Sequence, residues 1–118
     1  MISDLLKPKS KEEINKKLAK LSKDDLNMLL FKASYFSYEL IVKELLKHGG
    51  VNVNYEYNGY IGLHLAADRG FYGICKMLID AGADVNKISD YGGTPLHHAK
   101  YNNKHDVVKL LKHHEIKQ

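Results

Sequence analysis

Apolar residues recur at helical spacing near the start of the chain. Ile14, Leu18 and Leu21 share one face of a helix. Ser10, with a glutamate three positions later, forms a capping box, which is a typical helix start. The sequence therefore predicts a helix over residues 11–21. Its apolar stripe needs a partner, which we expect to be the exposed end of the next helical unit.

Further helices are predicted in the middle of the chain. Ser22 favours a helix start by N-capping, and residues 63–69 and 73–81 form two shorter helices. Gly70 between these two is expected to adopt a left-handed backbone, and Gly82 ends the second as a C-terminal glycine. The inward face of this second helix carries Ile74, Cys75, Leu78 and Ile79.

The pattern returns after 33 residues. Residues 59–66 align with residues 92–99, and Asn103 aligns with Gly70 as the non-glycine residue type that best tolerates a left-handed backbone. One period earlier, residues 30–49 keep only the apolar spacing. A period of this length is typical of repeated two-helix units, which offer an extended surface for partners and no shared reaction centre. Apolar pairs at this offset are Ile74 with Val107, Cys75 with Val108, and Leu78 with Leu111.

Residues 94–99 (Thr-Pro-Leu-His-His-Ala) and 81–86 (Ala-Gly-Ala-Asp-Val-Asn) resemble the ankyrin repeat, and the resemblance covers residues 25–115. It implies an all-α fold, an ankyrin-repeat solenoid of stacked helix-turn-helix units joined by β-hairpin-like loops. The expected organisation is one ankyrin-repeat domain over residues 1–118, with an N-terminal capping helix region at 1–24, a degenerate repeat at 25–57, a repeat at 58–90 and a C-terminal capping repeat at 91–118.

The units differ in how well they match the family pattern. Thr94 can cap a helix and Pro95 suits its first turn. Residues 61–62 are Ile-Gly instead, which predicts a less firmly fixed helix start in the preceding unit. The Val-Asn pair at 53–54 lies one residue later than the pair at 85–86, and we interpret this as a shifted turn.

Two aligned pairs carry structural expectations. His64 and His97 match the family's histidine, and the resemblance implies a side-chain hydrogen bond that steadies the hairpin and the inner helix. Lys100 stands where Ala67 would let a neighbouring unit pack closely. A lysine there predicts that no further unit follows, so we expect a finished short array, capped on both sides.

The charge balance is mildly basic. The net charge is +4, and Arg69 is the only arginine among 18 basic residues. Nucleic-acid binders gather basic residues on one face and favour arginine, whereas these lysines are scattered, so nucleic acid is an unlikely partner. Electrostatic association with nucleic acid or an acidic membrane surface through lysines stays an alternative.

The only cysteine, Cys75, cannot form an intrachain disulfide and lies on an apolar helix face, where burial is expected. No apolar stretch has the length of a signal-peptide core or a membrane span. We therefore expect an intracellular, cytoplasmic location and no membrane span. Delivery into a host cell stays open.

Catalytic motifs are missing from the sequence. The seven histidines show no metal-ligand spacing with cysteine or carboxylates. No Ser/His/Asp or Cys/His set and no glycine-rich phosphate loop is recognisable. We predict that the chain is not an enzyme, with no catalytic residue, metal, cofactor or small-molecule substrate.

Tyrosines gather in the segments that would form a binding surface. The family resemblance implies a concave groove lined by hairpin tips and inner helices, and tyrosine offers a large contact area at low rotamer cost. Alternatively, these rings simply fit half-buried turn surfaces. The predicted function is a non-catalytic protein–protein interaction module, an adaptor or an inhibitor, expected as a monomer; a self-associating scaffold is the alternative. The predicted partner-binding residues are Tyr35, Phe36, Tyr55, Tyr57, Asn58, Tyr60, Asp68, Arg69, Ile88, Asp90, Tyr91, Tyr101 and Asn102.

Overall fold

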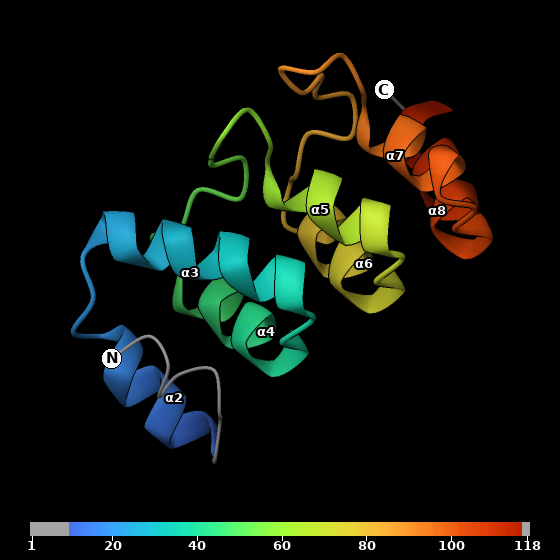
Figure 1. Cartoon of the computed structure of the whole chain (residues 1–118). Helices are drawn as coiled ribbons and strands as arrows, with labels where there is room; N and C mark the ends of the chain where they lie inside the picture. The colour runs from blue at the N-terminus through green and yellow to red at the C-terminus, as the bar shows by residue number, and fades with distance from the viewer. Residues whose placement is uncertain (1–9, 117–118) are drawn as a thin grey trace.

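The computed structural model describes residues 10–116 of the chain, as two rows of α-helices (Figure 1). The inner row consists of α3 (Lys23–Phe36), α5 (Gly62–Arg69) and α7 (Pro95–Tyr101). The outer row consists of α2 (Lys11–Leu18), α4 (Glu39–His48), α6 (Tyr72–Asp80) and α8 (His105–Ile116).

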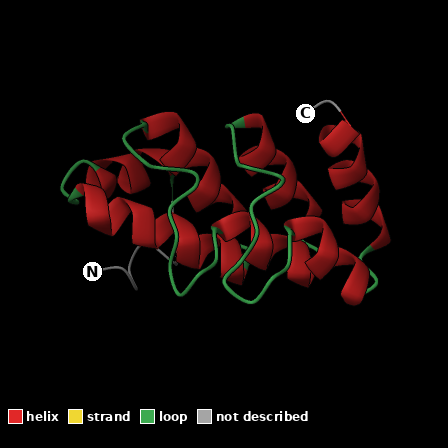
Figure 2. Ribbon diagram, turned by 90° about the horizontal axis from the view of Figure 1, so that it is seen from above, coloured by secondary structure: helices red, strands yellow, loops and turns green. Residues whose placement is uncertain are grey.

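Consecutive helices form pairs, and the pairs stack side by side. In each row the neighbouring helices of successive pairs are in contact, and α2 packs against α4 at the start of the outer row. Two long loops run from the outer row back to the inner row (Figure 2). The molecule measures 38 × 24 × 24 Å. The predicted all-α solenoid of stacked helix-turn-helix units is confirmed, whereas the predicted boundaries between its units stay predictions.

A continuous apolar spine runs between the two rows. Equivalent positions of the units are buried together, because the same side chain of each unit meets that of the next. Full burial of a Val, Leu or Ile side chain contributes about 1.5–3 kcal/mol. The buried sets are Leu30, Leu63 and Leu96; Ala33, Ala66 and Ala99; Ile41, Ile74 and Val107; and Leu45, Leu78 and Leu111.

Cys75 belongs to this spine, as predicted, and is fully buried. Burial raises the pKa of its thiol to about 12, with a smaller contribution from the negative charge of Asp106. The thiolate form is therefore scarce at neutral pH, and the side chain acts as a small apolar group.

The N-terminal helix is shorter than predicted. The Ser10 hydroxyl accepts a hydrogen bond from the Glu13 N–H (3.2 Å), which confirms the helix start, but α2 ends at Leu18 and not at residue 21. The Leu21 N–H donates to the Leu18 carbonyl (3.1 Å), so the chain tightens into a turn there. This turn lets Ser22 cap α3, where its hydroxyl accepts from the Asp25 N–H (3.2 Å).

The other predicted helices differ from the structure by one residue at their ends. The segment predicted at 63–69 starts at residue 62, and the segment predicted at 73–81 covers 72–80. The predicted left-handed backbone occurs at Gly70 (φ 77°), Gly82 (φ 97°) and Asn103 (φ 59°). The first unit has Ser37 at the position equivalent to Gly70, and it is also left-handed (φ 63°).

The first connecting loop contains a tight hairpin. The Tyr57 N–H donates to the Tyr60 carbonyl (2.9 Å) and the Tyr60 N–H donates back (3.1 Å). Asn58 (φ 53°) and Gly59 (φ 83°) form the turn, and this dipeptide suits a two-residue hairpin because both positions need positive φ. In the second loop the Ser89 N–H donates to the Gly93 carbonyl (2.8 Å) in the corresponding place.

An asparagine side chain holds the start of each of the two long loops. The Asn27 side chain accepts from the Asn52 N–H, and the Asn54 side chain accepts from the Asp84 N–H, each at 2.7 Å. The same local turn recurs at Asn52 to Asn54 and at Asp84 to Asn86, where a side-chain oxygen accepts from the N–H two residues on (2.9 Å). The first turn thus lies one residue late, which confirms the shifted turn.

Candidate functional site

An apolar pocket of about 290 Å³ opens between α3, the first loop and the start of α5. Aromatic rings form most of its wall, and Lys32 also lines it. The lining residues are Phe31, Lys32, Tyr35, Phe36, Tyr57, Asn58, Tyr60 and Leu65.

Ring contacts hold these aromatic side chains in place. Phe31 meets Tyr57 edge to face, with ring centroids 5.4 Å apart, and so joins α3 to the loop. Tyr35 and Phe36 make a similar contact at 4.8 Å. The guanidinium of Arg69, from α5, lies 4.7 Å from the centre of the Tyr35 ring, which is a cation–π distance. The pocket wall therefore depends on contacts between two successive units.

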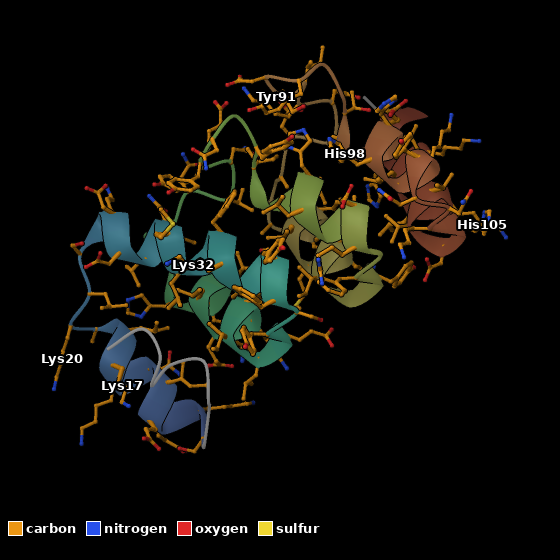
Figure 3. All side chains as sticks on the ribbon, in the orientation of Figure 1. Lys17, Lys20, Lys32, Tyr91, His98 and His105 are labelled. Carbon is orange, nitrogen blue, oxygen red and sulfur yellow. The ribbon has the colours of Figure 1, made fainter. Side chains whose placement is uncertain are left out.

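A second pocket of about 310 Å³ lies one unit further on, between α5, the second loop and α7. Figure 3 places Tyr91 in the loop and His98 on the neighbouring helix. Tyr60 from the first pocket stacks on Tyr91 from the second, with centroids 5.6 Å apart and an interplanar angle of 26°. This stack stands between the two pockets. The second is lined by Asp68, Ser89, Tyr91, Gly93, His97, His98 and Tyr101.

A polar network organises the floor of the second pocket. Asp68 Oδ1 accepts a hydrogen bond from Asn102 Nδ2 (2.7 Å) and lies 3.3 Å from His98 Nδ1. Asn102 Nδ2 also donates to the His98 carbonyl (3.0 Å). The Asp68 side chain keeps 44% of its surface exposed, so a carboxylate remains open to solvent at this point.

His64 has the structural role that the resemblance implied. The Ile61 N–H donates to its Nδ1 (3.0 Å), so Nε2 carries the proton and donates to the Lys87 carbonyl (2.8 Å). Burial is the main cause that lowers the pKa of this imidazole below its usual value. His64 thus ties the start of α5 to the second loop.

The same prediction is wrong for His97. Its side chain is exposed and its ring lies against His98, with centroids 6.3 Å apart. A hydrogen bond like that of His64 needs a carbonyl from a following loop, and within residues 10–116 no such loop follows α7.

The structure divides the predicted binding residues into four groups. Five line the first pocket, three line the second, and Arg69 and Asn102 hold members of these sets in position. Tyr55, Ile88 and Asp90 line neither pocket: Tyr55 is half-buried, while Ile88 and Asp90 are exposed on the second loop. The pocket-lining residues are Tyr35, Phe36, Tyr57, Asn58 and Tyr60 for the first, and Asp68, Tyr91 and Tyr101 for the second.

Several lining residues were missed from the sequence. Lys32, Leu65 and His98 occupy one equivalent position of the three units, and each lines a pocket. The repeat alignment contains this signal, because Tyr35, Asp68 and Tyr101 three positions later were selected in all three units. The other missed residues are Phe31, Ser89, Gly93 and His97.

The arrangement suits binding. Among the described residues, no three His, Cys, Asp or Glu side chains are placed to hold a metal ion. Over that same part of the chain, no helix combines the length and the apolar character that crossing a membrane requires. What the pockets offer is apolar area, ring faces, one exposed carboxylate and hydrogen-bonding groups.

Comparison with known proteins agrees with the repeat architecture. The family model of ankyrin repeats in three copies matches residues 4–89 and 29–118. The chain is 34% identical over 84 residues to BCL-6 corepressor-like protein 1 of Homo sapiens (70% of this chain, 5% of that protein). It is 39% identical over 71 residues to protein phosphatase 1 regulatory subunit 12A of Mus musculus (58% and 7%), and 36% identical over 80 residues to L-asparaginase of Dirofilaria immitis (68% and 13%).

The chain thus matches only a small part of each relative's length. The family match extends over most of the chain, and the paired helices, left-handed turns and loop hydrogen bonds recur from unit to unit. This chain belongs to the ankyrin-repeat family.

Proposed function

We propose that this chain is a non-catalytic interaction module that binds a partner protein through the two pockets between its inner helices and long loops. The observation that carries the proposal is the apolar first pocket, whose rings are partly exposed yet held by neighbours from two units. Tyr57 keeps 43% of its surface exposed and Phe36 keeps 52%. Rigid aromatic side chains of this kind are frequent anchors in protein interfaces.

An adaptor or an inhibitor role belongs to the same proposal. One relative is by name a regulatory subunit of protein phosphatase 1, which is a role carried out through another protein. We further propose that the chain acts as a monomer inside the cell; the single cysteine, buried in the spine, supports this location.

Quantitative pull-down with matched variants tests the groove. Tyr57→Ala removes a ring from the first pocket, and Tyr72→Ala removes an equally exposed ring (42%) from the outer row. From a lysate of the source cells, the partner should be recovered by the wild type and Tyr72→Ala, and lost with Tyr57→Ala. If Tyr57 is an anchor, its truncation should weaken the binding free energy by more than about 1 kcal/mol. Equal recovery by both variants would refute the groove.

The distribution of the lysines argues against partner binding by electrostatic attraction alone. Lys17 pairs with Glu13 (3.8 Å), Lys76 with Asp80 (3.8 Å) and Lys87 with Glu56 (3.1 Å), in three separate parts of the molecule. In Figure 3, Lys17 and Lys20 lie near the N-terminal end, away from Tyr91 and His98. If partner recovery falls steeply with salt and is unchanged by Tyr57→Ala, binding through the lysines would be favoured. Sedimentation that depends on protein concentration would reveal self-association.

A further inference from the structure

We infer that the two pockets recognise a two-point pattern in the partner: an apolar side chain in the first pocket and an arginine or lysine side chain in the second. This inference rests on the proposed function and adds the chemistry of the bound segment. The two pockets differ in charge, and this difference sets which group enters which pocket.

The first pocket suits a neutral apolar group. Its wall is built largely from rings and Leu65, and its volume of about 290 Å³ can hold a leucine-sized or phenylalanine-sized side chain. Lys32 lines this pocket, and the guanidinium of Arg69 lies 4.7 Å from the ring centre of Tyr35, another lining residue. A cationic side chain would therefore meet like charge here.

The second pocket suits a cation. Both hydrogen-bonding contacts of Asp68 within the described part of the chain are made by Oδ1, which leaves Oδ2 to accept from a ligand. Tyr91 and Tyr101 line the same pocket, with 78% and 82% of their surface exposed. A guanidinium or ammonium group gains from a carboxylate and from ring faces together.

The repeat architecture sets the separation of the two points. One pocket lies between α3 and α5 and the other between α5 and α7, so they are one helix spacing apart, about 8–10 Å. A polyproline-type segment presents residues i and i+3 on one side about 9 Å apart. An α-helix presents i and i+7 about 10 Å apart. The partner segment should show one of these two spacings.

Selection of displayed random peptides on the immobilised full chain tests this pattern at pH 8, where free imidazole is largely uncharged. Enriched peptides should share an apolar residue and an arginine or lysine at one of the two spacings, in either chain direction. For an enriched peptide made synthetically, Asp68→Asn should raise the Kd about three- to ten-fold. The same peptide with its cationic residue replaced by glutamine should lose this sensitivity.

Asp80→Asn is the matched control, because it removes the same charge from an exposed site on the outer row. It should leave the Kd unchanged, while Tyr57→Ala should weaken peptides with and without the cation. Peptides that depend on Tyr57 but show no linked cation, or no response to Asp68→Asn, would overturn the inference and leave the proposed function standing. Peptide binding that is unchanged by Tyr57→Ala and by Tyr35→Ala would overturn both the inference and the proposed function.

Discussion

At the end of α3 the chain turns on Ser37, a serine held in the left-handed conformation (φ 63°). The equivalent residues of the other units, Gly70 and Asn103, tolerate this backbone better. The first unit therefore carries a local cost at the scale of one residue.

Ser37→Gly should raise the free energy of unfolding by about 0.5–1 kcal/mol, because relief of the left-handed strain exceeds the extra chain entropy of glycine. Urea titration followed by far-UV circular dichroism measures the change. Gly70→Ser should move the midpoint the opposite way. A lower midpoint for Ser37→Gly would show that the serine side chain has a stabilising role.

His64 predicts a pH dependence. Burial lowers the pKa of His64 below its usual 6.5. Below that pH the His64 imidazole is therefore protonated more in the unfolded chain than in the folded chain. This part of the stability is present above about pH 6.5 and is lost as the pH falls below it. His64→Leu should cost about 1–3 kcal/mol near pH 7, since it leaves the Ile61 N–H and the Lys87 carbonyl without their partner.

Urea midpoints compared between about pH 7.5 and about pH 5.5 test the linkage. The decrease of the urea midpoint from the higher to the lower pH should be smaller in His64→Leu than in the wild type. The exposed His97 provides the control, and His97→Gln should keep the wild-type fall. An undiminished fall in His64→Leu would assign the effect to other groups.

At the scale of elements, the helix starts show how far local sequence determines structure. Thr94 caps α7 by accepting from the His97 N–H (3.2 Å), as its sequence predicts. At the start of α5, where Ile and Gly replace Thr and Pro, His64 reaches back to the Ile61 N–H instead. Gly62 lies so close to α3 that a Cβ there would be 3.0 Å from Ser34 Oγ. The close approach of Gly62 to Ser34 depends on how α5 packs against α3, so it is not visible in the local sequence.

Leu63 and Leu65 give α5 two faces that separate stability from binding. Leu63 is fully buried in the spine, whereas Leu65 lines the first pocket and is half-buried. Leu63→Ala should lower the free energy of unfolding by about 2–5 kcal/mol through an internal cavity. Leu65→Ala should cost much less stability and reduce partner recovery.

Urea titration and pull-down of the two leucine variants provide the measurements. Similar stability losses for both would mean that Leu65 belongs to the spine. Unchanged recovery with Leu65→Ala would remove it from the binding surface.

The fold could be predicted well from the sequence, because the 33-residue period, the helix-capping residues and the turn residues act locally and recur from unit to unit. It predicted the pockets less completely. Tyr55 and Ile88 lie in the right loops, but which loop residues face a pocket depends on how two units pack. Phe31 was missed because its role arises from the contact with Tyr57, a residue in another element.

At the scale of the whole molecule, Cys75 reports on the integrity of the stack. Its buried thiol, with a pKa of about 12, cannot react with an alkylating reagent until the surrounding helices separate. Iodoacetamide labelling near pH 8 should be slow in the folded chain. It should rise with urea at the same midpoint as the loss of helical circular dichroism.

Coincident midpoints would mean that the paired helices unfold as one cooperative body. Labelling at clearly lower urea would show that α6 opens before the rest of the array.

The loop tips are joined by their main chains, since the Asp90 N–H donates to the Gly59 carbonyl (3.2 Å) next to the Tyr60–Tyr91 stack. The loop surface beside both pockets is therefore already ordered before a partner binds. Little ordering entropy is then lost on docking, and complex formation needs no prior rearrangement. Encounter and orientation would govern the association rate of a partner, so changes in affinity among Tyr57, Tyr60 and Tyr91 variants should arise in the dissociation rate.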